Sequence, residues 1–142
     1  MKSKIRRLLH LLKQISRNIN YAANEELFWD QYVKDWEKSE KPKRQHVGSE
    51  WKYEEDFLAL LQKYAAAEKE ALEIGCGGGR ITTIGVKLFK HVHAADISEE
   101  MLRKARETVT SSNVSFHKLD GFALKDFSDS SLDFVYSHDV FG

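Results

Sequence analysis

The chain has 142 residues, of which 42% are hydrophobic and 31% charged, and this is enough for one domain with its own hydrophobic core. No apolar run approaches the roughly 20 residues that a membrane-spanning helix needs, and no secretory signal is visible. The single cysteine, Cys76, excludes an intramolecular disulfide and is typical of a reducing compartment, so we expect a cytoplasmic protein.

The net charge of zero conceals an uneven distribution. Residues 1–20 carry six Lys or Arg and no acidic residue, whereas the other 122 residues carry 16 basic and 22 acidic side chains. An acidic body argues against nucleic acid as a partner. Only the basic N-terminal segment is suited to attract a polyanion or an anionic membrane.

The first third of the chain predicts helices. In residues 3–19, apolar side chains recur at helical spacing and basic side chains fill the opposite face. Such a helix either lies on a membrane or partner, or packs on its own domain or a second subunit. We expect a second helix over 24–38, a polar connector with the only proline over 38–50, and a third helix over 53–67.

From residue 70 the pattern changes to alternating strands and helices. The expected elements are a strand over 71–74, a helix over 80–89, a strand over 91–96, a helix over 98–111 capped by Ser98, and strands over 113–120 and 132–137. This order predicts a parallel sheet with right-handed crossovers. The chain should therefore divide into a helical segment with its connector, 1–50, and an α/β domain, 51–142.

A glycine-rich loop, Glu73-Ile74-Gly75-Cys76-Gly77-Gly78-Gly79-Arg80, joins the first predicted strand to its helix. Open α/β sheets bind ligands at such strand ends, and the helix that follows offers free N–H groups to an anion. A dinucleotide site would need a glycine where Arg80 stands, and the Gly-Lys-Ser/Thr of a phosphate loop is absent. A glycine-rich turn without a ligand is the remaining alternative.

Two acidic residues follow the next two predicted strands. Asp96 ends the second strand, where a carboxylate can accept both hydroxyls of a ribose or simply open the next helix. Asp120-Gly121 ends the third strand, where it either addresses the polar edge of an adenine or forms an ordinary Asp-Gly turn.

These motifs together resemble the class I S-adenosylmethionine-dependent methyltransferases, over roughly residues 70–139. The resemblance rests on LEIGCGGGRITT, HAADISEEMLRKARE and NVSFHKLDGFALKDFSDSSLDFVYS. It implies an α/β fold, a three-layer Rossmann-like sheet that is mostly parallel, here incomplete with about four strands, preceded by N-terminal helices. The cofactor that it implies is S-adenosylmethionine, and the acceptor is expected to be a small molecule.

The resemblance also implies roles for single residues. Glu73, Gly75 and Gly77 would hold the methionine part of the cofactor, with Cys76 and Gly79 in the same loop. Asp96 would hold the ribose, Ile97 would lie beside the adenine, and Asp120 and Gly121 would recognise its edge. Ser137 would contact the cofactor after the fourth strand. Trp51 is either an apolar lid residue or a core residue.

Methyl transfer needs a general base only when the nucleophile must lose a proton. His138 and Asp139 follow the fourth strand and are the base candidates, although His138 also suits a structural role. His91 and His93 share one face of a strand, but no carboxylate or cysteine set completes a metal site, so we expect no metal.

The class I methyltransferases that this sequence resembles have a sheet of seven strands, whereas this sequence ends after the fourth. The fourth strand would be an exposed edge, which a homodimer is one way to cover. Methyl transfer by this chain alone is therefore one hypothesis. The alternative is a non-catalytic module that binds a nucleotide cofactor or serves dimerisation.

Overall fold

The computed structural model describes residues 2–39 and 54–140, and for residues 2–11, 14–20 and 54 it describes the backbone alone. Its elements are α1 Lys2–Lys38, α2 Glu54–Tyr64, β1 Glu70–Ile74, α3 Thr82–Leu88, β2 His91–Asp96, α4 Glu99–Thr108, β3 Val114–Lys118 and β4 Phe134–Ser137. None of the described helices is long and apolar enough to cross a membrane.

The four strands form one parallel sheet in the order β3-β2-β1-β4. This confirms the predicted parallel α/β sheet of about four strands. The chain adds strands on one side of β1 first and then places β4 on the other side. The strand order therefore reverses between β1 and β4, which is where open α/β sheets form their ligand crevice.

One face of the sheet carries the helices α2, α3 and α4. Ala71, Val92, Val114 and Phe134 lie in register on this face because side chains alternate along a strand. Two buried clusters pack there, one under α2 and α3 around Ala71 and Val92, and one under α4 around Ala94. The described residues thus supply the sheet and a helical layer on one face, while residues 119–133 form a loop.

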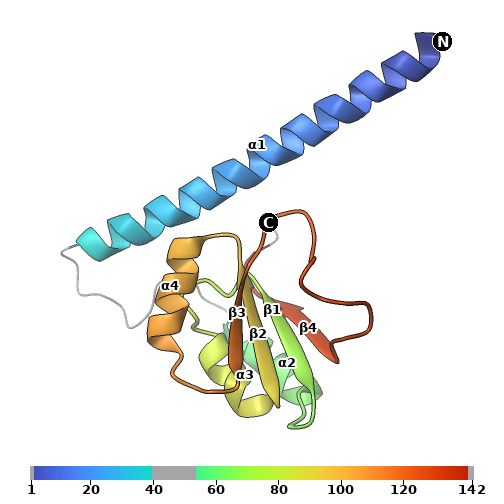
Figure 1. Cartoon of the computed structure of the whole chain (residues 1–142). Coiled ribbons are helices and arrows are strands. Elements are labelled where there is room, and N and C mark those ends of the chain that lie inside the picture. Colours follow the sequence, from blue (N-terminus) through green and yellow to red (C-terminus); the bar gives the residue numbers. More distant parts are fainter. Residues whose placement is uncertain (1, 40–53, 141–142) are drawn as a thin grey trace.

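The N-terminal region differs from the prediction of two helices over 3–19 and 24–38. The structure has one continuous helix, α1, because residues 20–23 contain no glycine or proline that would end it. Figure 1 shows α1 running past the sheet, so that its first turns extend beyond the body of the domain. Leu12, from the predicted apolar face of the first helix, is 52% exposed.

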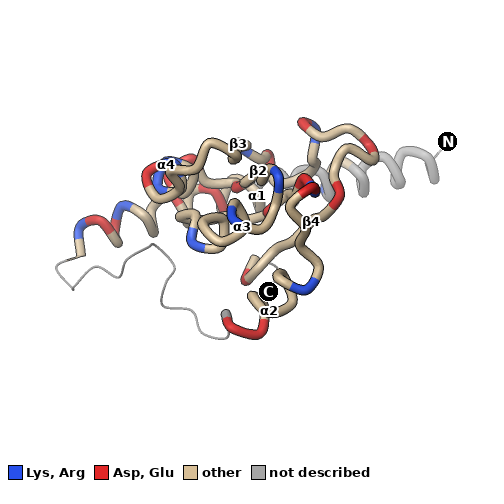
Figure 2. The backbone as a smooth tube through the Cα atoms, turned by 90° about the horizontal axis from the view of Figure 1, so that it is seen from below, with Lys and Arg blue, Asp and Glu red and all other residues tan. Residues whose placement is uncertain are grey.

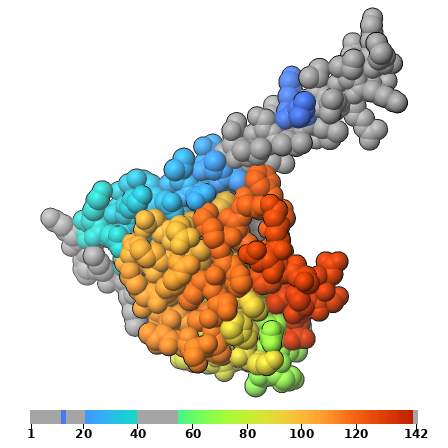
Figure 3. Space-filling model, in the orientation of Figure 1, coloured from blue at the N-terminus to red at the C-terminus, as the bar shows by residue number. Residues whose placement is uncertain are grey.

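The second half of α1 packs along α4 (Figure 3). Val33 is fully buried against Met101, and Glu37 pairs with Arg103 at 2.8 Å. Asp30 accepts a hydrogen bond from the Ser98 hydroxyl, while Ser98 caps α4 as predicted. Figure 2 marks acidic and basic residues on both helices. The end of α1 is therefore joined to the sheet domain, and the boundary at residue 50 stays a prediction.

Candidate functional site

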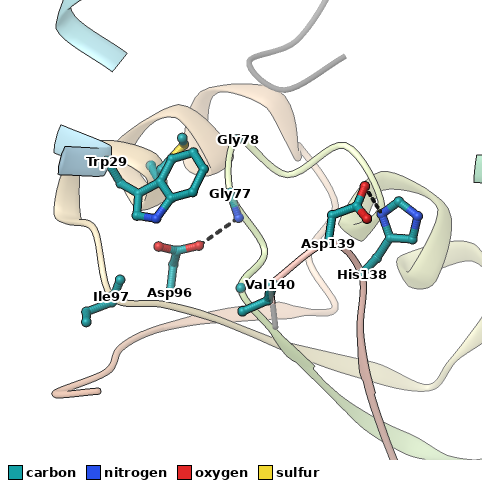
Figure 4. Close-up of a pocket in the computed structure, with 10 residues that line it drawn as sticks. Trp29, Gly77, Gly78, Asp96, Ile97, His138, Asp139 and Val140 are labelled. Carbon is teal, nitrogen blue, oxygen red and sulfur yellow. Dashed lines mark hydrogen bonds and ion pairs between the residues drawn. The ribbon is translucent and has the colours of Figure 1, made fainter. Parts of the chain in front are cut away.

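The site lies at the carboxyl ends of β1, β2 and β4 and is a hollow that we call the glycine hollow. It is lined by Gly75, Gly77 and Gly78 after β1, Asp96 and Ile97 after β2, His138, Asp139 and Val140 after β4, and Trp29 and Met101 from helices. Figure 4 shows Trp29 and Asp96 on one side of the glycine loop and His138 and Asp139 on the other. The hollow contains about 540 Å³ not filled by protein atoms, open solvent included.

The predicted glycine loop reaches the site, but its glycines serve different purposes. Gly77 has a φ of +51°, and a Cβ there would meet only the Met101 sulfur at 4.0 Å, so its bare Cα leaves the hollow open. Gly79 has a φ of +85°, and a Cβ there would lie 3.1 Å from the Ala105 Cα. Gly79 therefore allows the loop to pack on α4, and it does not line the hollow.

Asp96 fixes the loop to the end of β2. Its carboxylate accepts hydrogen bonds from the backbone N–H groups of Gly77 and Ser98, each at 2.8 Å. The side chain is nearly buried, and burial raises the pKa of the Asp96 carboxyl while these N–H groups lower it. Each carboxylate oxygen keeps a second lone pair, so Asp96 can still accept hydroxyl hydrogens from a ligand in the hollow.

Glu73 differs from the expectation that it would hold part of a ligand. It is 3% exposed, and its carboxylate accepts hydrogen bonds from the hydroxyls of Thr82 at 2.7 Å and Tyr136 at 3.2 Å. Burial raises the pKa of Glu73 to about 7. Because Glu73 shares a face with Ala71, it points under α3 instead of into the glycine hollow.

Cys76 also turns away from the hollow. It belongs to the buried cluster of Ala94, Leu102 and Ala105, beneath α4. Burial raises the pKa of the Cys76 thiol well above its ordinary value, so the thiol is neutral and suits a small core residue.

Asp120 lies outside the glycine hollow. Its carboxylate accepts hydrogen bonds from the backbone N–H groups of Phe122 and Ala123 and from the Lys125 ammonium. The Lys125 ammonium and these N–H groups lower the pKa of Asp120 to about 2. Asp120 thus forms the ordinary Asp-Gly turn, which was the alternative to adenine recognition.

Gly121 lines a second hollow beside the first, which we call the helix hollow. Besides Gly121, its lining includes Tyr21, Glu25, Trp29, Ile97, Phe122 and Val140. A Cβ on Gly121 would lie 2.9 Å from the Ala22 Cβ, so glycine here lets α1 pack closely on the turn after β3. The two hollows share Trp29, Ile97 and Val140, and together they extend from the glycine loop to the end of β3.

Trp29 lines both hollows, a position that was not predicted from the sequence. Its ring makes edge contacts with Phe28 and Tyr32, with centroid distances of 5.1 and 5.6 Å. The available signal was the four-residue spacing of Tyr21, Glu25 and Trp29, which places them on one helix face. Trp51, the tryptophan that the sequence suggested as a lid or core residue, lies outside the described residues.

The segment after β4 brings His138 and Asp139 to the glycine hollow. His138 Nδ1 lies 3.5 Å from Asp139 Oδ2, and the centroids of the His138 and Phe57 rings are 4.6 Å apart.

The Ser137 hydroxyl, at the end of β4, is buried and has no hydrogen-bond partner. In the described part of the chain, no other buried side-chain oxygen or nitrogen lacks one. An unpartnered hydroxyl beside a crevice is suited to bind a polar ligand atom.

Within residues 2–39 and 54–140, no group of three or more His, Cys, Asp or Glu side chains is arranged to hold a metal ion. His93 and His117 are within hydrogen-bonding distance of each other, 3.0 Å apart, on the face opposite the helices.

The sequence model of the methyltransferase domain family matches residues 72–142, which is half of the chain. Among curated relatives, the ribosomal protein L11 methyltransferase of Ruminiclostridium cellulolyticum is 45% identical over 51 residues, 35% of this chain and 16% of that protein. The phosphoethanolamine N-methyltransferase of Plasmodium falciparum is 31% identical over 72 residues, 50% of this chain and 27% of that protein. The matches thus span about a quarter or less of these relatives.

A solved structure extends the fold comparison beyond the sheet. Phosphoethanolamine N-methyltransferase 1 of Haemonchus contortus, in complex with phosphoethanolamine and S-adenosylhomocysteine, superposes with a TM-score of 0.62 and 24% identity. The superposition covers 82% of this chain and 25% of that chain. The fold described above is therefore that of a methyltransferase, in an incomplete form.

Proposed function

The chain belongs to the methyltransferase domain family, and we propose that its crevice binds S-adenosylmethionine for methyl transfer to a small molecule. The observation that carries this proposal is the pairing of Asp96 with the Gly77 N–H beside an open glycine surface. A carboxylate and a Cβ-free loop at the strand switch point suit a ribose and the methionine chain attached to it.

The residues present fit this cofactor. In our proposal Asp96 accepts the ribose hydroxyls, Gly77 leaves room for the methionine part, and Ile97 contacts the base. Gly75 lines the same hollow, but the Val140 side chain fills the place of its missing Cβ, so Gly75 lets the segment after β4 pack on the glycine loop. The unpartnered Ser137 hydroxyl is an additional polar contact. When bound, S-adenosylmethionine supplies an electrophilic methyl group on a sulfonium, and the protein supplies orientation and exclusion of water.

His138 and Asp139 are the groups that we propose for proton transfer from the acceptor. Both line the glycine hollow, and the His138 side chain is only 12% exposed while its partner is 48% exposed. A neutral imidazole can take a proton from a nucleophile, and a neighbouring carboxylate can stabilise the imidazolium that results.

A small acceptor suits the lining of the site. Trp29, Ile97 and Val140 line both hollows, and apolar side chains with a few polar groups are typical of small-molecule sites. The Plasmodium relative is by name a phosphoethanolamine methyltransferase, whereas the Ruminiclostridium relative is by name a ribosomal protein methyltransferase.

The proposal is tested by titrating the 142-residue chain with S-adenosylmethionine and then assaying release of S-adenosylhomocysteine with panels of small amines, phenols and thiols. Binding with turnover on one panel supports it. Ribosomal protein is assayed separately, and turnover on it alone would contradict the small-molecule acceptor. Binding without turnover on any of these substrates would favour the alternative of a non-catalytic module. Absence of binding would contradict both.

A further inference from the structure

Helix α1 presents one face to the helix hollow. Tyr21, Glu25 and Trp29 are spaced four residues apart, so they lie on one side of the helix, and all three line the hollow. Across it lie Ile97 and Phe122, which follow β2 and β3. Among the described lining residues, Glu25 is the only charged side chain.

The position of this face is fixed by contacts on both sides of the turn after β3. Ala22 packs on Gly121 so closely that a Cβ on the glycine would lie 2.9 Å away. Glu26 pairs with Lys118 at 2.8 Å, and the same ammonium donates to the Ile97 carbonyl. The face of α1 is therefore held against the segment that our proposed function assigns to the adenine.

Asp120, the acidic residue expected at the adenine edge, is engaged elsewhere. Its carboxylate accepts three hydrogen bonds within its own turn, and it lines a different hollow together with Ala22, Ala23 and Glu26. Glu25 is half-buried, and its carboxylate has no hydrogen-bond or ion-pair partner in the part of the chain that the structure describes. The Glu25 carboxylate is thus available as a hydrogen-bond acceptor on the α1 side of the helix hollow.

We propose that Glu25 recognises the exocyclic amino group of the cofactor's adenine, so that α1 determines base specificity. This inference rests on the proposed function. The amino group of adenine donates hydrogen bonds, and a carboxylate only accepts them. Hypoxanthine carries a carbonyl oxygen at the same position, which a carboxylate repels. The rings of Tyr21, Trp29 and Phe122 provide flat apolar surfaces for the base.

The test compares two ligands on two forms of the whole chain. S-adenosylhomocysteine and S-inosylhomocysteine, its deaminated counterpart, are titrated calorimetrically into the native chain and Glu25→Gln. The native chain should prefer the adenine ligand by about 10- to 100-fold, because the Glu25 carboxylate accepts from an amino group but meets a carbonyl oxygen in the deaminated ligand. An amide both donates and accepts, so Glu25→Gln should reduce this preference at least tenfold, with a melting temperature close to native.

Two matched variants control for indirect effects. Asp35→Asn removes an exposed carboxylate of the same helix and should leave both affinities unchanged. Glu26→Gln breaks the ion pair with Lys118 and should lower the affinities for both ligands by similar factors. An unchanged preference in Glu25→Gln would overturn the role of Glu25 while leaving the proposed function standing. Failure of the native chain to bind either ligand would overturn the proposed function, and this inference with it.

Discussion

The Asp96 carboxylate accepts a hydrogen bond from the backbone N–H of Gly77 at 2.8 Å, which ties the glycine loop after β1 to the end of β2. Its second oxygen accepts from Ser98 N–H, at the start of α4. One buried side chain thereby sets the shape of the loop and places an acceptor at its edge. Stability and ligand binding should therefore both depend on Asp96.

Replacing Asp96 by Asn should weaken binding of S-adenosylhomocysteine about 10- to 100-fold, because charge-assisted hydrogen bonds to the ribose become neutral ones. Asn has one acceptor oxygen, so one of the two backbone N–H groups also loses its partner, at a cost of about 1–3 kcal/mol. Calorimetry and urea unfolding measure the two effects. A 2′-deoxyribose ligand should lose less affinity on this substitution than the ribose ligand, and equal losses would contradict the contact.

Gly77 and Gly79 form a matched pair for separating binding from packing. Gly77→Ala places a methyl group in the glycine hollow, so it should reduce ligand affinity, with a stability loss of about 1 kcal/mol from the positive φ. Gly79→Ala forces a Cβ against Ala105 and Val109 beneath α4, so it should lower the melting temperature far more. The reverse order of melting temperatures would show that these roles are wrong.

Glu73 should make stability depend on pH. Burial raises its pKa from 4.5 to about 7, so between these values the folded chain binds more protons than the unfolded chain. The free energy of unfolding contributed by Glu73 therefore falls as the pH rises from 4.5 through 7.

The variant Glu73→Gln keeps an acceptor for Thr82 and removes this titration. It should match the native chain near pH 4.5 and exceed its stability above pH 7 by up to about 3 kcal/mol. Urea unfolding at a series of pH values measures the difference, in which the contributions of the histidines cancel. Parallel profiles for the two proteins would contradict a buried neutral carboxyl.

Trp29 should contribute to ligand binding from outside the matched family region. Its side chain lines both hollows, so Trp29→Ala should weaken the binding of S-adenosylhomocysteine about tenfold, because an aromatic contact with the ligand is lost. Phe28→Ala, which removes the 59% exposed neighbour, is the control and should have little effect on affinity. Equal effects of the two substitutions would indicate a general loosening of α1.

The sheet could be predicted from the sequence because its apolar runs are short and have glycine, asparagine or acidic residues at one or both of their ends. The run Ala71 to Ile74, which is followed by Gly75, is an example. The helix cap at Ser98 was predictable for the same reason, because it depends only on residues that are neighbours in the sequence. The continuous α1 was missed because two apolar patterns suggested two helices, although nothing between them ends a helix.

The candidate site was predicted less completely, for reasons of geometry. Strand alternation alone places Glu73 on the face shared with Ala71, but a resemblance to known enzymes assigned it to the ligand. The position of Trp29 in the same hollow as Asp96 depends on how α1 packs over α4. That packing involves pairs such as Asp30 and Ser98, which are 68 positions apart, and local patterns do not encode it. The Asp120 carboxylate accepts its hydrogen bonds within its own turn. This is the ordinary Asp-Gly turn that the sequence left open as the alternative to adenine recognition.

The central claim is that the crevice beside Asp96 and Gly77 binds S-adenosylmethionine. Isothermal titration of the 142-residue chain with S-adenosylhomocysteine, beside Asp96→Asn under the same conditions, tests it most directly. We expect saturable binding at one site per chain that weakens at least tenfold in the variant. No measurable heat with the native chain, or equal affinity for both proteins, would contradict it.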